Sequence, residues 1–124
     1  MDGPVFDQAE LGILGNCVED YCGSAELLWA LQRQTPTLTN RSVLVRRGLD
    51  ILNRLMTDGL IAAYVKSADA AAPFSPASEP IDELLAVVER EHVISPETPS
   101  AQRYWFAATP DGVARYFEFQ QKAS

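Results

Sequence analysis

The sequence is poor in the residues from which catalytic, metal and extracellular sites are usually built. Its 124 residues include one histidine and two cysteines, which are too few for a zinc site or a disulfide scaffold. With one histidine, no nucleophile motif and no glycine-rich phosphate loop, a hydrolase triad or a nucleotide site lacks parts. No run of about 18 apolar residues occurs, so we expect no membrane span. The N-terminus has neither a basic start nor an apolar stretch, which argues against a signal peptide and favours the cytoplasm. We expect no enzyme, no cofactor and no metal.

Basic residues are also scarce, and they are unevenly placed. Ten basic and seventeen acidic residues give a net charge of −7, which argues against a general nucleic-acid coat or an anionic-membrane binder. Residues 1–32 hold six acids and no basic residue, and residues 67–100 hold seven acids and one arginine. Residues 33–66, by contrast, hold six basic residues and two acids. The positive charge is therefore concentrated in this one segment.

The first two helices are predicted from their ends. Asp7 can cap the first helix, with Glu10 reaching back to the Asp7 amide, and Gly23 supplies a left-handed stop. Ser24 then caps a second helix, which ends before Pro36 because proline disfavours a helical residue in front of it. Apolar residues at helical spacing line the first helix: Leu11, Leu14, Val18 and Tyr21.

The strongest helical pattern lies in residues 40–58, which Gly59 ends. Its apolar stripe consists of Val45, Leu49, Leu52 and Met56. Residues 60–66 and the aromatic segment 103–108 are predicted to be strands. Pro110 is suited to the first position of a last helix.

The segment between the two strands, residues 67–100, has loop-like ends rich in alanine, serine and proline. Its middle predicts a short helix, with Ser78 as the cap and Pro80 in the first turn. One face of that helix is apolar and carries Ile81, Leu84, Leu85 and Val88. A short helix cannot leave such a stripe in water, so we expect it to pack onto the core rather than form a separate domain.

These elements predict a mainly helical α+β fold in a single domain, residues 1–124, with three helices sharing a core with a two-stranded antiparallel ribbon. Two short sequence segments resemble those of a known protein family. Residues 52–61 (LNRLMTDGLI) resemble the end of a recognition helix that runs through a glycine into a wing strand. Residues 105–112 (WFAATPDG) are similar to an aromatic second wing strand followed by a helix start. The sequence thus resembles the winged helix-turn-helix domain of bacterial regulators, with an insert of 34 residues in place of a short wing tip.

The resemblance implies a DNA-binding surface on the helix of residues 40–58. At 100° per residue, the side chains that point away from its buried stripe are Ser42, Val43, Arg46, Arg47, Asp50, Asn53, Arg54 and Thr57. In a docked winged helix, such residues meet base edges and phosphates. The candidate DNA contacts are Arg41, Ser42, Arg46, Arg47, Asn53 and Arg54. The alternative is a solvated helix face, since Asp50 can pair with Arg46 and Arg54 at i,i+4 spacing.

The function we favour is a small winged-helix transcriptional regulator that binds double-stranded DNA as a homodimer. The last helix offers a dimerisation surface with Tyr116, Phe117 and Phe119. One alternative is an interaction module of the inhibitor or immunity type, which no longer binds DNA and whose acidic insert contacts a basic protein. The other is a ligand-sensing domain, whose pocket would be lined by Trp29, Tyr104, Trp105 and Phe106.

The remaining candidates for chemistry have simpler interpretations. Cys17 and Cys22 lie five residues apart, which is neither a metal nor a redox spacing, so we expect buried free thiols. His92 has no co-ligand and is expected to be structural or exposed. The solvent-exposed face of the insert's helix is predicted to carry four carboxylates: Asp82, Glu83, Glu89 and Glu91. The four aromatic residues of the ligand-pocket alternative are more simply explained by core packing.

Overall fold

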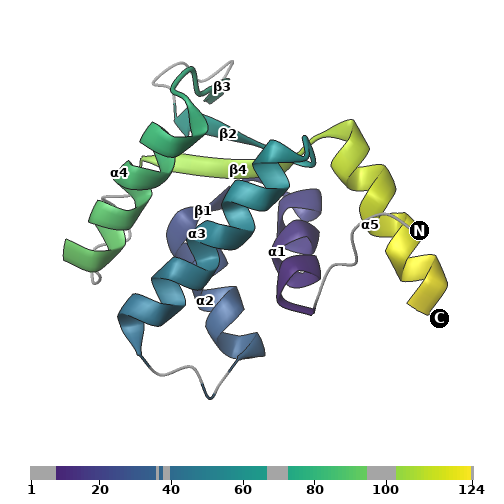
Figure 1. Cartoon of the computed structure of the whole chain (residues 1–124). Helices are drawn as coiled ribbons and strands as arrows, with labels where there is room; N and C mark the ends of the chain where they lie inside the picture. Colours follow the sequence, from purple (N-terminus) through teal and green to yellow (C-terminus); the bar gives the residue numbers. More distant parts are fainter. Residues whose placement is uncertain (1–7, 36, 38–39, 67–72, 95–102, 124) are drawn as a thin grey trace.

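The computed structural model describes residues 8–35, 37, 40–66, 73–94 and 103–123. In these residues it contains five helices and a four-stranded antiparallel sheet (Figure 1). The helices are α1 (Gln8–Glu19), α2 (Ser24–Gln34), α3 (Arg41–Thr57), α4 (Ile81–Ile94) and α5 (Pro110–Ala123). The strands are β1 (Cys22–Gly23), β2 (Ile61–Lys66), β3 (Phe74–Pro76) and β4 (Tyr104–Ala108). None of the helices described is long and apolar enough to cross a membrane.

The two predicted strands, β2 and β4, form the centre of the sheet. They pair antiparallel from Ile61 opposite Ala108 to Val65 opposite Tyr104. The prediction of only two strands was wrong, because β1 pairs with the outer side of β4 and β3 pairs with the outer side of β2, in the order β1-β4-β2-β3. Segments of two and three residues are too short to show the alternation by which strands are recognised in a sequence.

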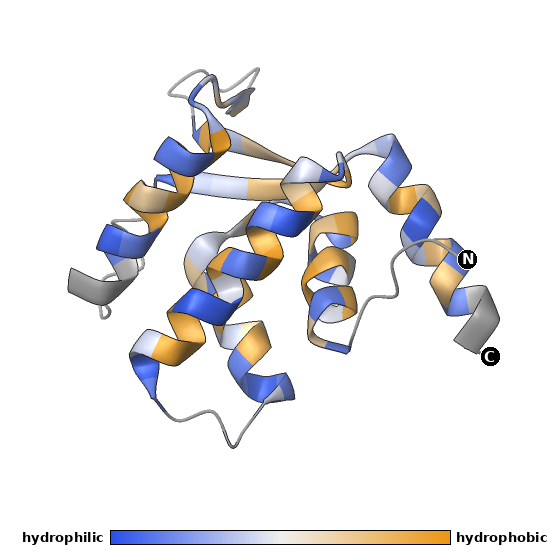
Figure 2. Ribbon diagram, in the orientation of Figure 1, coloured by the Kyte–Doolittle hydropathy of each residue, from blue (hydrophilic) through white to orange (hydrophobic). Residues whose placement is uncertain are grey.

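The core lies between one face of this sheet and the helices α1, α2 and α3. On β4, Tyr104 and Phe106 are buried, while Trp105 between them lies on the opposite face. Figure 2 shows the matching pattern along α3, where hydrophobic and hydrophilic bands alternate. Its buried residues are Leu44, Val45, Gly48, Ile51, Leu52 and Leu55. The sheet face and the helix stripes therefore close one common hydrophobic cluster.

The connection from α1 to α2 differs from its prediction. Helix α1 ends at Glu19, and Tyr21 stacks on Phe74 with ring centroids 4.1 Å apart instead of extending the stripe. Gly23 has φ −71°, so it is no left-handed stop; it precedes α2 in extended backbone and lies opposite Trp105. Ser24 is the first residue of α2 rather than its cap. Asp7, the expected cap of α1, lies outside the described residues.

The ends of α3 agree with the sequence. The Val43 amide donates to Asn40 Oδ1 at 3.2 Å, and Gly59, with φ +74°, ends the helix in the left-handed region. The hydroxyl of Thr109 donates to the Gly59 carbonyl at 2.6 Å and accepts from the Gly112 amide at 3.0 Å. This bridge joins the turn after α3 to the start of α5.

The insert contributes β3 and α4, and α4 packs alongside α3 (Figure 1). Leu84 and Val88 are buried and join the common core, as the apolar stripe predicts. The Ala77 amide donates to the Ala63 carbonyl at 2.9 Å, which ties the segment before α4 to β2. The described part of the insert, residues 73–94, therefore lies against the helices and the sheet.

Candidate nucleic-acid interface

The outward face of α3 is open to solvent. Arg41, Ser42, Arg46, Asn53 and the remaining outward residues Val43, Asp50 and Thr57 are exposed, whereas Arg47 and Arg54 are half-buried. All six candidate DNA contacts thus lie on one helix, on the side opposite its buried stripe. A shallow hollow of about 350 Å³ lies over the first half of this face, between Ser42 and Asp50.

Arg54 is engaged with an acid of α1. Its Nη1 lies 2.7 Å from Oε2 of Glu10, whose side chain is only 6% exposed, while the Arg54 side chain is 36% exposed. The sequence indicated Glu10 as a capping residue and Arg54 as a possible partner of Asp50. Neither expectation anticipates this pair, because it joins residues 44 positions apart on two helices. Arg54 is accordingly a bridge between α1 and α3.

Asp50 remains on the exposed face without the predicted partners. Among the described residues, it forms no ion pair with Arg46 or Arg54. The salt-bridged face that the i,i+4 spacing suggested is therefore absent at these positions.

The stretch of sequence that leads from α2 into α3 carries arginines and no acids. Residues 27–49 contain Arg33, Arg41, Arg46 and Arg47 and neither aspartate nor glutamate. The Arg33 guanidinium lies 4.3 Å from the ring centroid of Trp29 on the exposed side of α2. The N-terminus of a helix carries a partial positive charge, so the first turn of α3 adds to the positive electrostatic potential of these arginines.

Helix α4 brings acids close to this surface without covering it. Asp82, Glu83 and Glu89 on α4 are exposed, and α4 packs along α3. Val88 of α4 lines a small apolar gap together with Val45, Gly48 and Leu49 of α3, so the contact is made with the buried stripe. The outward face of α3 consequently stays accessible beside an acidic neighbour.

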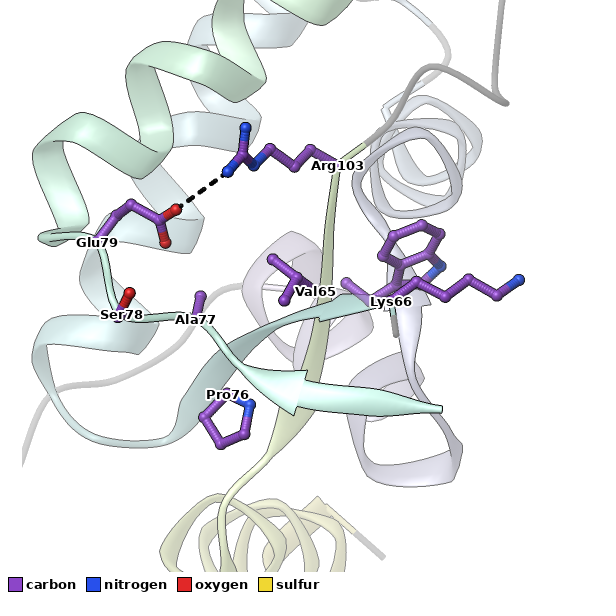
Figure 3. A pocket seen from close by; sticks show the side chains of 8 residues that line it. Val65, Lys66, Pro76, Ala77, Ser78, Glu79 and Arg103 are labelled. Atoms are coloured by element: carbon purple, nitrogen blue, oxygen red, sulfur yellow. Dashed lines mark hydrogen bonds and ion pairs between the residues drawn. The ribbon is translucent and has the colours of Figure 1, made fainter. Parts of the chain in front are cut away.

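A second hollow, of about 450 Å³, lies at the edge of the sheet next to the start of α4 (Figure 3). Its walls come from three separate segments: Val65 and Lys66, residues 76–79, and Arg103 with Trp105. Arg103 Nη2 lies 3.4 Å from Glu79 Oε1 across the hollow. The pKa of Glu79 is lowered by hydrogen bonds from its own amide and from the Tyr104 hydroxyl, and by the charge of Arg103.

The aromatic residues proposed for a ligand pocket are not brought together. Trp29 is 61% exposed on α2, whereas Tyr104 and Phe106 are in the core and Trp105 lies on the outer face of the sheet. Core packing is thus the correct interpretation for Tyr104 and Phe106 and the wrong one for Trp29. On the outer sheet face, Phe74 contacts both Tyr21 and Trp105 through its ring.

The two cysteines are buried thiols, and one predicted surface carboxylate is half-buried. Cys17 and Cys22 are free and buried, as predicted; burial raises the pKa of Cys17 and raises that of Cys22 to about 11. Both are therefore thiols, not thiolates, at neutral pH. Glu91 departs from the predicted wet side of α4: it is half-buried, and burial raises its pKa. The side chain of His92 lies outside the description.

Within the residues that the structure covers, no three histidine, cysteine, aspartate or glutamate side chains cluster as metal ligands. Comparisons of the chain with protein-family models, with curated proteins and with solved structures found no match.

Proposed function

We propose that the chain is a winged-helix domain that binds double-stranded DNA with the first half of α3. The observation that carries the proposal is the arginine cluster of residues 27–49, a stretch without aspartate or glutamate in which Arg33, Arg41 and Arg46 are exposed, in a chain whose net charge is −7. Exposed arginines clustered on one helix give even an acidic chain a local attraction for phosphate. Three helices followed by the antiparallel pair β2 and β4 support the fold assignment.

The proposed DNA contacts fall into two groups, one placed for base edges and one placed for phosphates. Ser42 and Arg46 project from the first turns of α3 and are placed to meet base edges in a major groove, where arginine pairs with guanine in a bidentate manner. Arg41 and Arg47 flank them and are suited to phosphate. Arg54 is left out of this set because its guanidinium is engaged with Glu10.

The test compares two exposed arginines that differ in position. Fluorescence anisotropy with mixed genomic duplexes, at about 50 and 200 mM salt, measures affinity and its salt dependence. Arg46→Ala should weaken binding and reduce the salt slope by about 1. Arg90→Ala on α4 removes the same charge from an exposed residue outside the candidate DNA contacts and should weaken binding much less. Equal effects of the two substitutions would contradict a site on α3.

Homodimerisation through α5 is part of the same proposal, because two half-sites need two recognition helices. The Tyr116 ring closely covers Gly15 of α1, and Phe119 packs on the core, so these two residues hold α5 in place. Phe117 remains 53% exposed and is the residue of α5 most available to a second copy. Sedimentation equilibrium of the wild type and Phe117→Ser should show loss of the dimer in the variant.

The acidic exposed surface of α4, next to α3, favours a second candidate: an interaction module that binds a basic protein. The DNA titration separates the two functions. Absence of binding by the wild type at the lower salt concentration would favour this candidate, because a winged-helix regulator keeps a nonspecific electrostatic attraction for DNA.

A further inference from the structure

We propose that Val43 is a specificity-determining residue of the α3 surface, where it contacts the 5-methyl group of a thymine in the major groove. The inference rests on the proposed function and adds to it the kind of base that the surface prefers. Val43 is 49% exposed, although the other outward residues of α3 are polar or charged. Exposure alone assigns no role, because isolated apolar residues occur on many surfaces. The position and the rigidity of Val43 carry the argument.

The position of Val43 puts its methyl groups among the proposed DNA contacts. At 100° per residue it lies about 200° around the helix from the buried Val45, and its direction falls between those of Arg46 and Arg47 one turn further on. These three outward side chains line the shallow hollow of about 350 Å³, whose described lining comes entirely from α3. The methyl groups of Val43 are therefore accessible to a duplex that lies on this face.

The cap of α3 fixes the backbone beneath Val43. The Val43 amide donates to Asn40 Oδ1 at 3.2 Å, which holds Val43 in the first turn of the helix. The valine side chain is β-branched and has one strongly preferred rotamer in a helix. Its methyl groups consequently occupy a defined position before any contact with DNA, and little side-chain entropy is lost on binding.

The thymine methyl is the group in the major groove that suits an aliphatic side chain. The other groups at the base edges there are hydrogen-bond donors and acceptors, and phosphates have no apolar part to cover Val43. Arg46 lies about 4.5 Å further along the helix axis, and one base-pair step is about 3.4 Å. A thymine in contact with Val43 should therefore lie within about two base pairs of a guanine that pairs with Arg46.

Removal of single methyl groups from the DNA provides the test. Duplexes that bind the wild type are selected from a random pool at about 50 mM salt, and each thymine of the most enriched duplex is replaced in turn by deoxyuridine, which lacks only the methyl group. At one position the replacement should weaken wild-type binding about fourfold, as measured by fluorescence anisotropy, because one methyl contact is lost. Val43→Ser should bind the thymine and deoxyuridine duplexes equally, since it has no methyl group to make the contact. Arg41→Ala removes a proposed phosphate contact from the same turn, so it should weaken binding to both duplexes and keep the fourfold ratio.

The outcomes separate this inference from the proposed function. Absence of wild-type binding to any duplex at this salt concentration overturns both. The role of Val43 alone is overturned if the wild type binds but no deoxyuridine replacement lowers its affinity, or if Val43→Ser keeps the preference for thymine. An enriched duplex without thymine has the same consequence.

Discussion

The ion pair between Glu10 and Arg54 makes an asymmetric prediction about stability. The two side chains approach to 2.7 Å, but Glu10 is 6% exposed and Arg54 is 36% exposed. Removing Arg54 leaves a carboxylate in a nearly dry site, whereas removing the charge of Glu10 leaves a guanidinium that water can still reach. The two single substitutions should therefore differ in cost although they break the same pair.

The magnitudes follow from that difference in exposure. Breaking a fully buried pair costs about 3–5 kcal/mol, most of which is the uncompensated charge. Arg54→Met approaches this range, at about 3 kcal/mol, since the Glu10 carboxylate stays buried. Glu10→Gln should cost only about 1 kcal/mol, because the amide keeps the size of the side chain and Arg54 turns toward solvent. The double variant should be more stable than Arg54→Met alone, because no buried charge remains.

Urea unfolding of the wild type, both single variants and the double variant provides the measurement. A double-mutant cycle separates the coupling energy from the packing lost with the arginine stem. The reasoning is refuted if Glu10→Gln costs as much as Arg54→Met, or if the double variant is the least stable of the four. Glu10→Gln also releases a cation beside the proposed DNA surface, so its affinity for duplex DNA should rise while that of Arg54→Met falls.

Three further predictions concern packing, pH and thiol reactivity. Gly112→Ala should cost about 3 kcal/mol in urea unfolding, because the added methyl would fall on the Leu60 carbonyl oxygen. Glu91→Gln should raise the denaturation temperature at pH 7, where the wild-type carboxylate is charged and half-buried; the gain should vanish as the pH falls through the raised folded pKa toward the unfolded value of 4.5. Cys17 and Cys22 should react with a thiol reagent at pH 8 only as fast as the protein unfolds, because both are buried and protonated there.

The elements predicted well are those with long periodic patterns and distinct ends. The predicted helix of residues 40–58 with a glycine stop is confirmed as α3, which ends at Gly59 as expected and whose first turn is capped by Asn40. Helix α4 was predicted from four apolar positions, of which Leu84 and Val88 are fully buried. Local chemistry decides such elements, and local chemistry can be read from a single sequence.

The features that the sequence did not disclose depend on distant segments. Strand β1 forms because Cys22 and Gly23 pair with Phe106 and Trp105 of β4. Two residues are too few to show a periodic pattern, so this pairing could not be predicted from the sequence. The ion pair between Glu10 and Arg54 forms only when α1 and α3 pack together. The hollow beside Lys66 is assembled from three segments of the chain, so its lining residues share no motif. Tertiary packing creates each of these features, and single-sequence patterns carry no record of it.

The acids of this chain indicate how α3 would meet a duplex. Glu10 neutralises the C-terminal half of the helix at Arg54, and Asp50 places an exposed negative charge at its middle. The first half, with Arg41, Arg46 and Arg47, has no acid in its sequence from residue 27 to residue 49. Among the charges of α3 and its partner Glu10, phosphate repulsion therefore grows from the N-terminus of the helix to its C-terminus. Under the proposed function, docking with the N-terminal turns of α3 deepest in the groove places Asp50 and the Glu10–Arg54 pair farther from the backbone of the DNA than docking with its C-terminal turns would.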